Sequence, residues 1–327
     1  MVAVVATVLA TAAASGLLIA THRRLMRLAL EGRDSAGRTG RVIAPLLRRL
    51  SDLPWRRPVE RAAFEFTLRT LLRSRTHGML MALYVGVAVA LVVSGLIPVM
   101  LRQGLAGFAE PDVGLLSGPL VLAFFTLAGL RVVVAIPVEP KANWIIRLLE
   151  PADRAAASTG VRNAFLVCGA LPPTLLAAAG AALLWGPWAA FVHGTVCAVM
   201  TWLLAELLLL GLGKLPFTST YYPGRGRLRT RWPLYLIAFT NYCFTTASVE
   251  LLFLSSPAHL VPFAVLGAIA IGAAWAVRLH RARALPGLTF EEEDPDAMFK
   301  GFQLSEGLAA ERTVATVAGR ESAVVGR

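Results

Sequence analysis

Charged residues are scarce in this chain of 327 residues. Asp, Glu, Lys and Arg make up 16% of the sequence, whereas about 25% is usual for a soluble domain. Hydrophobic residues make up 56%, and the mean hydropathy is +0.64. These values argue against a water-soluble fold.

Residues and motifs that mark common enzymes are also missing. The three cysteines, Cys168, Cys197 and Cys243, lie in apolar stretches without CxxC or Cys/His spacing, which predicts neither a disulfide nor a metal site. The sequence contains no Walker A, HExxH, GxSxG or SxxK pattern, and its five histidines are scattered. We therefore expect no enzyme activity and no cofactor.

What the chain does have is positive charge between long apolar runs. Its net charge is +12 and its pI is about 10.7. In a soluble protein this charge would suggest nucleic acid as a partner. Because it lies between stretches long enough to span a bilayer, we expect anionic lipid headgroups as the partner instead.

The apolar runs predict an all-α polytopic bundle of about seven transmembrane spans. A bilayer core about 30 Å thick requires about 20 apolar residues per helix. Gly186 and Pro187 alone separate the fourth and fifth runs, which predicts a tight helical hairpin. The seven runs cover residues 2–20, 79–101, 114–138, 163–185, 188–212, 232–254 and 259–277.

The distribution of Arg and Lys predicts the orientation of these spans. All of the 32 basic residues except Arg102 and Arg131 fall in one set of alternate connections, and cationic loops stay in the cytoplasm. This places the N-terminus outside and the C-terminus inside, in a bacterial cytoplasmic (inner) membrane. The connections are residues 22–78, 139–162, 213–231 and 278–327.

The same reading divides the chain into four parts. Residues 1–21 form the first span, 22–78 a basic cytoplasmic region, 79–277 a bundle of six spans, and 278–327 a polar tail that we expect to be disordered. The first run has no basic region before it, which favours a membrane anchor over a cleaved signal peptide. Its uncharged start fits the C-terminal part of a longer chain as well as a complete protein.

Two segments of the basic region have helical amphipathic spacing. Residues 42–50 and 64–73 alternate apolar positions with arginines. We interpret both as interfacial helices in the inner headgroup layer. A solvated connector with incidental periodicity is the alternative.

A third basic segment has arginines at every second position: Arg225, Arg227, Arg229 and Arg231. In an extended chain the four guanidinium groups would share one face, which suits phosphate oxygens. Lipid headgroups, a specific phosphorylated ligand and an acidic partner protein all fit this pattern.

Ionisable residues inside spans are candidate functional residues, because charge in hydrocarbon is costly. Arg131 and Glu206 lie at equal predicted depth, which permits an ion pair, although both side chains could also reach the interface separately. His193 and Glu250 lie near the outer interface and could share a proton-linked site. Separate access to water is the alternative for these two residues.

Two further features fall within predicted spans. The sixth span has a wide polar face, which we expect to point toward the bundle interior, for interhelical hydrogen bonding or a substrate path. Asn241, Thr245 and Ser248 share one helical face, with Tyr242, Thr246 and Glu250 alongside. Pro172 and Pro173 predict a kink or break in the fourth span, a device found in transporters and also in plain kinked helices.

Residues 64–77, which run directly into the second span, resemble the entry of ABC-type permease subunits, where a basic interfacial helix precedes a span. With residues 142–147, 215–224 and 232–235, they also resemble a family of uncharacterised permease-like membrane proteins of GC-rich bacteria. This resemblance covers most of residues 60–300. The short connection between the second and third spans makes the ABC-2 exporter type the closer analogy, so the resemblance implies a separate ATP-binding subunit.

Three functions remain open from the sequence. The first is a permease subunit that exports a lipid-like or amphipathic substrate, as a homo- or hetero-oligomer. The second is a non-catalytic scaffold that binds anionic lipid or partner proteins through its arginines. The third, which the missing catalytic motifs disfavour, is a membrane-embedded lipid-modifying enzyme that uses Glu206, His193 or Glu250.

Overall fold

The computed structural model describes residues 57–136, 153–210, 217 and 235–284, and within these ranges the secondary structure is helical, without strands. Six helices there are long and apolar enough to cross a membrane. The chain is thus a multi-pass helical membrane protein. The six are Arg75–Gln103, Val113–Val133, Arg154–Trp185, Pro187–Leu209, Tyr235–Ser255 and Leu260–Ala284.

Several predicted features lie outside the described residues. These are the first span at residues 2–20, the amphipathic segment 42–50, the four alternating arginines at 225–231, and the tail beyond residue 284. The seven-span count and the outside location of the N-terminus therefore stay predictions.

The six described spans correspond to the second to seventh predicted spans, and two of them extend furthest beyond the predicted bounds. The fourth span begins at Arg154 instead of residue 163, and α12 (Leu260–Ala284) continues past residue 277. Both extensions carry arginines, so a search for apolar runs ends too early at these points. The predicted boundary between the bundle and the tail at residue 278 was wrong, because Arg278 lies inside α12.

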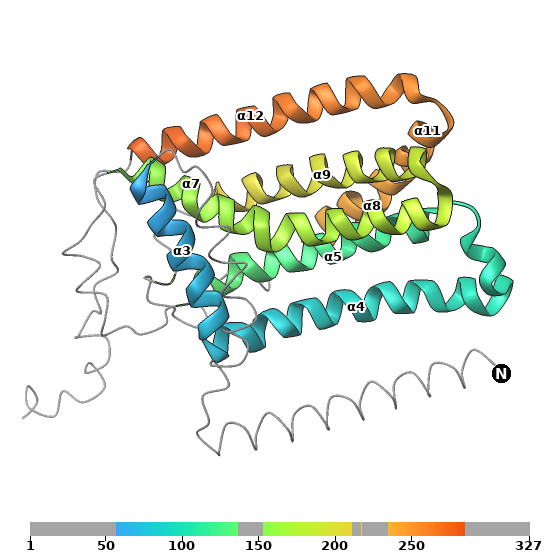
Figure 1. Ribbon diagram of the computed structural model, residues 1–327, viewed down its shortest axis with the longest axis horizontal. Helices are drawn as coiled ribbons and strands as arrows, with labels where there is room; N and C mark the ends of the chain where they lie inside the picture. The colour runs from blue at the N-terminus through green and yellow to red at the C-terminus, as the bar shows by residue number, and fades with distance from the viewer. Residues whose placement is uncertain (1–56, 137–152, 211–216, 218–234, 285–327) are drawn as a thin grey trace, which may run out of the picture.

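The spans run side by side, and α3 (Pro58–Arg73) lies across one end of them (Figure 1). We call this end the α3 end and the opposite end the far end. Helix α9 (Pro187–Leu209) is central, since it packs against α5 (Val113–Val133), α8 (Leu171–Trp185), α11 (Thr246–Ser255) and α12. Helix α4 (Arg75–Gln103) packs mainly on α5.

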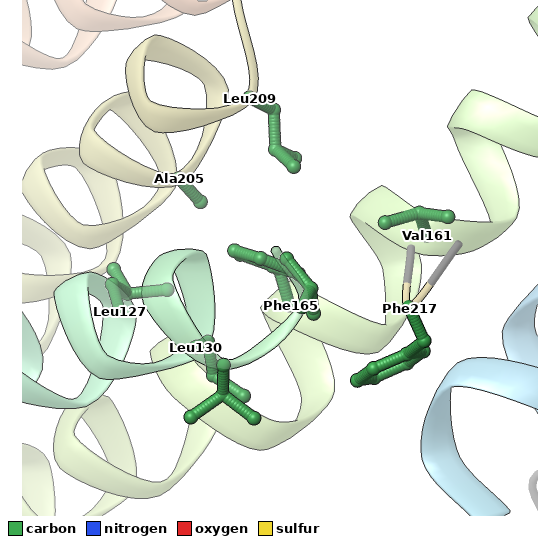
Figure 2. Close-up of a cluster of buried hydrophobic side chains, with 9 residues drawn as sticks. Leu127, Leu130, Val161, Phe165, Ala205, Leu209 and Phe217 are labelled. Atoms are coloured by element: carbon green, nitrogen blue, oxygen red, sulfur yellow. The ribbon is translucent and has the colours of Figure 1, made fainter. Parts of the chain in front are cut away.

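A buried hydrophobic cluster fills the α3 end of the bundle (Figure 2). It joins α5, α7 (Arg154–Phe165) and α9 to Phe217, whose ring lies 5.1 Å from that of His77. The Phe217 N–H donates to the Val134 carbonyl over 2.7 Å. The cluster contains Leu127, Leu130, Val133, Val134, Val161, Phe165, Ala205, Leu209 and Phe217.

Helix α3 is the amphipathic helix predicted at residues 64–73. It begins with Pro58. Proline suits this position because the N–H groups of the first helical turn have no acceptor within the helix, so the missing N–H costs no hydrogen bond. Its buried face, with Phe64 and Leu68, packs on α7. The two backbones approach closely at Gly160, where a Cβ atom would lie 2.2 Å from the Glu60 carbonyl oxygen. The helix is therefore docked on the bundle as well as amphipathic.

The two prolines of the fourth span follow a π-helical turn, η3 (Leu166–Ala170), instead of a break. The Leu171 N–H reaches the Leu166 carbonyl, five residues back. Pro172 and Pro173 lack N–H groups and their rings crowd the preceding turn. The wider π turn accommodates them, so the helix continues from Arg154 to Trp185.

The predicted hairpin between the fourth and fifth spans is confirmed. Helix α8 ends at Trp185 and α9 begins at Pro187, with Gly186 at φ +89° between them. This left-handed conformation suits glycine, because a Cβ would clash with the backbone there.

Candidate functional site: two buried charge clusters

Glu206 is the centre of the first cluster, near the α3 end. Its carboxylate is fully buried on α9. Arg278 Nε of α12 donates to Glu206 Oε2 over 2.9 Å, and Arg162 Nε of α7 lies 3.4 Å from Oε1. Arg278 Nη1 also donates to the Ser158 hydroxyl over 2.6 Å. We call these four residues the arginine cluster, and they join three helices.

The arginine cluster extends toward α3. The Arg162 guanidinium lies 5.5 Å from the centre of the Trp202 ring, a cation–π arrangement. The next residue, Asn163, donates to Glu60 Oε1 of α3 over 2.9 Å. Glu60 also attracts Arg162 electrostatically. Two carboxylates thus balance two guanidinium groups where α3, α7, α9 and α12 meet.

The predicted ion pair between Arg131 and Glu206 was wrong in its cation. Arg131 Nε donates to the Leu208 carbonyl over 3.0 Å, whereas Glu206 takes Arg278 and Arg162. Equal depth on two helices does not fix the direction in which each side chain points. The true partners, Arg162 and Arg278, lie in segments that the sequence predicts to be cytoplasmic, residues 139–162 and 278–327. A search for apolar runs ends the spans at these charged residues.

His193 and Glu250 form the second cluster, in the far half of the bundle. His193 Nδ1 of α9 lies 2.6 Å from Glu250 Oε1 of α11. The two side chains are 3% and 0% exposed. Glu250 Oε2 is buried and has no hydrogen-bond partner. The structure therefore brings these two predicted residues together as a pair without access to water, which we call the His–Glu pair.

The structure contradicts the predicted inward direction of the polar face of the sixth span for three of its residues. Asn241, Thr245 and Ser248 are exposed in the described part of the structure, whereas Tyr242 and Glu250 of the same span are buried. We call the three exposed residues the polar stripe. They need no second helix, because each hydrogen bonds within its own helix: Asn241 Nδ2 to the Ile237 carbonyl (2.9 Å), Thr245 Oγ1 to Asn241 Oδ1 (3.4 Å) and Ser248 Oγ to the Phe244 carbonyl (2.8 Å).

A third polar contact lies just outside the fourth span. Asp153 is the N-cap of α7, where its side chain accepts the Ala156 N–H over 3.0 Å, and it also pairs with Arg57. The Ala156 N–H and the Arg57 guanidinium both stabilise the carboxylate, which lowers the pKa of Asp153. This contact adds to the attachment of α3 at the start of α7.

Nothing in the described residues gathers three His, Cys, Asp or Glu side chains into a metal site. Comparison with known protein families, with characterised proteins and with solved structures finds no match to this chain. The chemistry of the two clusters and the polar stripe therefore follows from their geometry alone.

Proposed function

We propose that the protein is a permease-like subunit of a transporter in a bacterial cytoplasmic membrane. Its substrate is lipid-like or amphipathic, and a separate ATP-binding chain supplies the energy. The polar stripe is the observation that carries this proposal, because it lies on the exposed face of a membrane-spanning helix.

A polar face toward lipid suits an amphipathic substrate. The headgroup of such a molecule would follow Asn241, Thr245 and Ser248, while its acyl chains stay in the bilayer. Exposed apolar side chains of the same span flank the stripe, among them Phe244 and Leu252. Buried ionisable groups behind this face, such as Glu250, are typical of transport paths.

The attachment of α3 supports a partner at the α3 end. This helix presents exposed arginines, including Arg61 and Arg69, on the face away from α7. Through Glu60 and Asn163 it is linked to Arg162 and so to the arginine cluster. A partner that moves α3 would therefore act directly on three spans.

Inverted membrane vesicles containing the tagged full chain test this function. The probe is a fluorescent short-chain phospholipid, whose ATP-dependent movement between leaflets is followed with a membrane-impermeant quencher. We expect the triple variant Asn241→Leu, Thr245→Val, Ser248→Ala to lose most of this movement. The matched control is Leu236→Ala, Val249→Ala, Leu252→Ala, which changes three exposed apolar residues of the same span.

Purification of the tagged chain from the same membranes tests the partner. Recovery of an ATP-binding chain supports the proposal. Failure to recover one, together with lipid movement that is indifferent to ATP, contradicts it. The scaffold alternative predicts a different pattern: the stripe variant behaves as wild type, and loss of Arg225, Arg227, Arg229 and Arg231 abolishes partner binding.

A further inference from the structure

The His–Glu pair lies inside the membrane-spanning part of the bundle. His193 is six residues from the start of α9, and Glu250 is five residues from the end of α11. At 1.5 Å per residue both lie about 8 to 9 Å from the far end of their helices. Apolar residues cover the same region, including Val192, Val196 and Phe253.

Fixed charges are missing around the pair on every described helix that packs against α9 or α11. Helix α8 contains no ionisable residue, and the ionisable residues of α5, α7 and α12 lie toward the α3 end. The remaining titratable neighbours are thiols, a phenol and the exposed imidazole of His259 in η5 (Pro257–His259), which packs on α11 at the far end. Cys197 Sγ lies 4.0 Å from His193 Nδ1, and the adjoining turn η4 (Asn241–Thr245) contributes Tyr242 and Cys243.

The absence of a third charge determines which charge states of the pair are favourable. When the pair holds one proton in addition to the N–H of the neutral imidazole ring, its net charge is zero. Loss of that proton leaves a buried anion and gain of another leaves a buried cation, and either costs several kcal/mol when no counter-charge is near. The pair therefore retains one proton.

The unpartnered oxygen decides where this proton lies. A buried ionised carboxylate needs a hydrogen-bond donor or a cation beside each oxygen. Glu206 Oε1 also lacks a hydrogen bond, but Arg162 Nε lies 3.4 Å from it, whereas Glu250 Oε2 has neither a donor nor a cation among the described residues. A carboxylic acid needs only one strong contact, from its O–H to the ring nitrogen. The separation of 2.6 Å between Oε1 and Nδ1 fits such a bond.

We propose that Glu250 and His193 form a buried proton-binding site, in which the Glu250 carboxyl O–H donates to neutral His193 Nδ1. The proton transfers reversibly to water when water reaches the far ends of α9 and α11. The neutral imidazole then carries its N–H on Nδ1 instead of Nε2, so that it donates to the carboxylate. Proton binding and release by this site are thereby linked to opening of the far end.

Infrared spectroscopy of the purified full chain in lipid nanodiscs tests this site. The difference between wild type and Glu250→Gln isolates the carbonyl stretch of the protonated Glu250 carboxyl. We expect this band to be present at about pH 7, where exposed carboxyls are ionised, and to be lost in Glu250→Gln. His193→Phe should keep the band but shift its frequency, because the O–H loses its acceptor.

Two controls keep the result decisive. Glu65→Gln removes a partly exposed carboxylate of α3 and should leave the band unchanged. If Glu250→Gln does not elute as a folded protein, Glu250→Asp replaces it and should shift the band. A wild-type spectrum without the band at about pH 7, where exposed carboxyls are ionised, overturns the proposal.

The outcome does not depend on the permease proposal. The readout is the protonation of one carboxyl, measured without substrate or ATPase. Loss of lipid movement with an intact band would contradict the transport function alone, and a missing band with active lipid movement would contradict the proton site alone.

Discussion

Two fully buried glutamates of the bundle differ in the kind of partner that surrounds them. Glu206 lies between two guanidinium groups, which stay charged at any pH at which the protein is folded. Glu250 has one imidazole, which can be neutral. The charges of the arginine cluster are therefore fixed, whereas the His–Glu pair can change its charge by binding or releasing a proton. Helix α9 carries one member of each, His193 and Glu206.

This difference predicts that the arginine cluster is the more sensitive to loss of its carboxylate. Glu206→Gln leaves two guanidinium groups buried without their shared counter-charge. We expect a loss of about 3 to 5 kcal/mol in the free energy of unfolding, measured by denaturant titration in detergent with circular dichroism. Glu65→Gln is the control, because its partners Arg61 and Arg69 are exposed. Equal stability of the two variants would contradict the cluster.

The second prediction concerns the close contact through which α3 reaches the arginine cluster. Gly160→Leu places a side chain against the Glu60 backbone and should cost about 1 to 3 kcal/mol through overpacking. Gly180→Ala is the control, because a Cβ there meets no atom within 4 Å. A cysteine pair across α3 and α7 should cross-link in the control and not in Gly160→Leu. Cross-linking in both would show that α3 is not displaced.

The third prediction concerns the effect on stability of replacing Glu250, the carboxyl of the His–Glu pair. Glu250→Gln replaces a neutral carboxyl with a neutral amide of similar size. We expect a loss below about 1.5 kcal/mol, the range of one hydrogen bond, in the same denaturant titration. A loss as large as that of Glu206→Gln would mean that Glu250 is ionised in the folded protein.

The smallest expected effect lies at Asp153, outside the spans. Asp153→Ala removes the N-cap of α7 and should cost about 1 kcal/mol. Because its pKa is lowered in the folded protein, the charge of Asp153 stabilises the fold above about pH 4 and this contribution is lost as the pH falls through the lowered pKa. The stability difference between wild type and Asp153→Asn should therefore shrink on acidification, in unfolding curves at a series of pH values.

The sequence predicted the positions of the described spans, because long apolar runs have few alternatives to a membrane helix. It missed Arg162 and Arg278 as core residues for the same reason. A search for apolar runs ends at the first arginine, whereas a helix continues through an arginine that finds a carboxylate. Glu206 itself was a signal, because an isolated carboxylate inside a span requires a cationic partner, and that partner could come from an arginine next to a predicted span.

Sequence periodicity could not predict whether the polar stripe faces the bundle interior or the lipid. Spacing shows that Asn241, Thr245 and Ser248 share a face, but not which neighbour that face meets. Serine and threonine hydroxyls satisfy themselves on carbonyls of the preceding turn, as Ser248 does on Phe244. Such side chains therefore have little need to face the interior of the bundle to find a hydrogen-bond partner. The sequence placed His193 and Glu250 near the same interface, which allowed them to meet. That they do meet depends on the packing of α11 against α9, which only the structure shows.

The π turn before Pro172 has a consequence for the register of the fourth span. Such a turn corresponds to one residue inserted into a regular α-helix. An inserted residue rotates everything after it by about 100° relative to everything before it, at 3.6 residues per turn. Ala177 and Ala181, which are buried in α8, owe their inward direction to that added residue, so the length of η3 sets the angular phase between the half of the span that meets α3 and the half that meets α9.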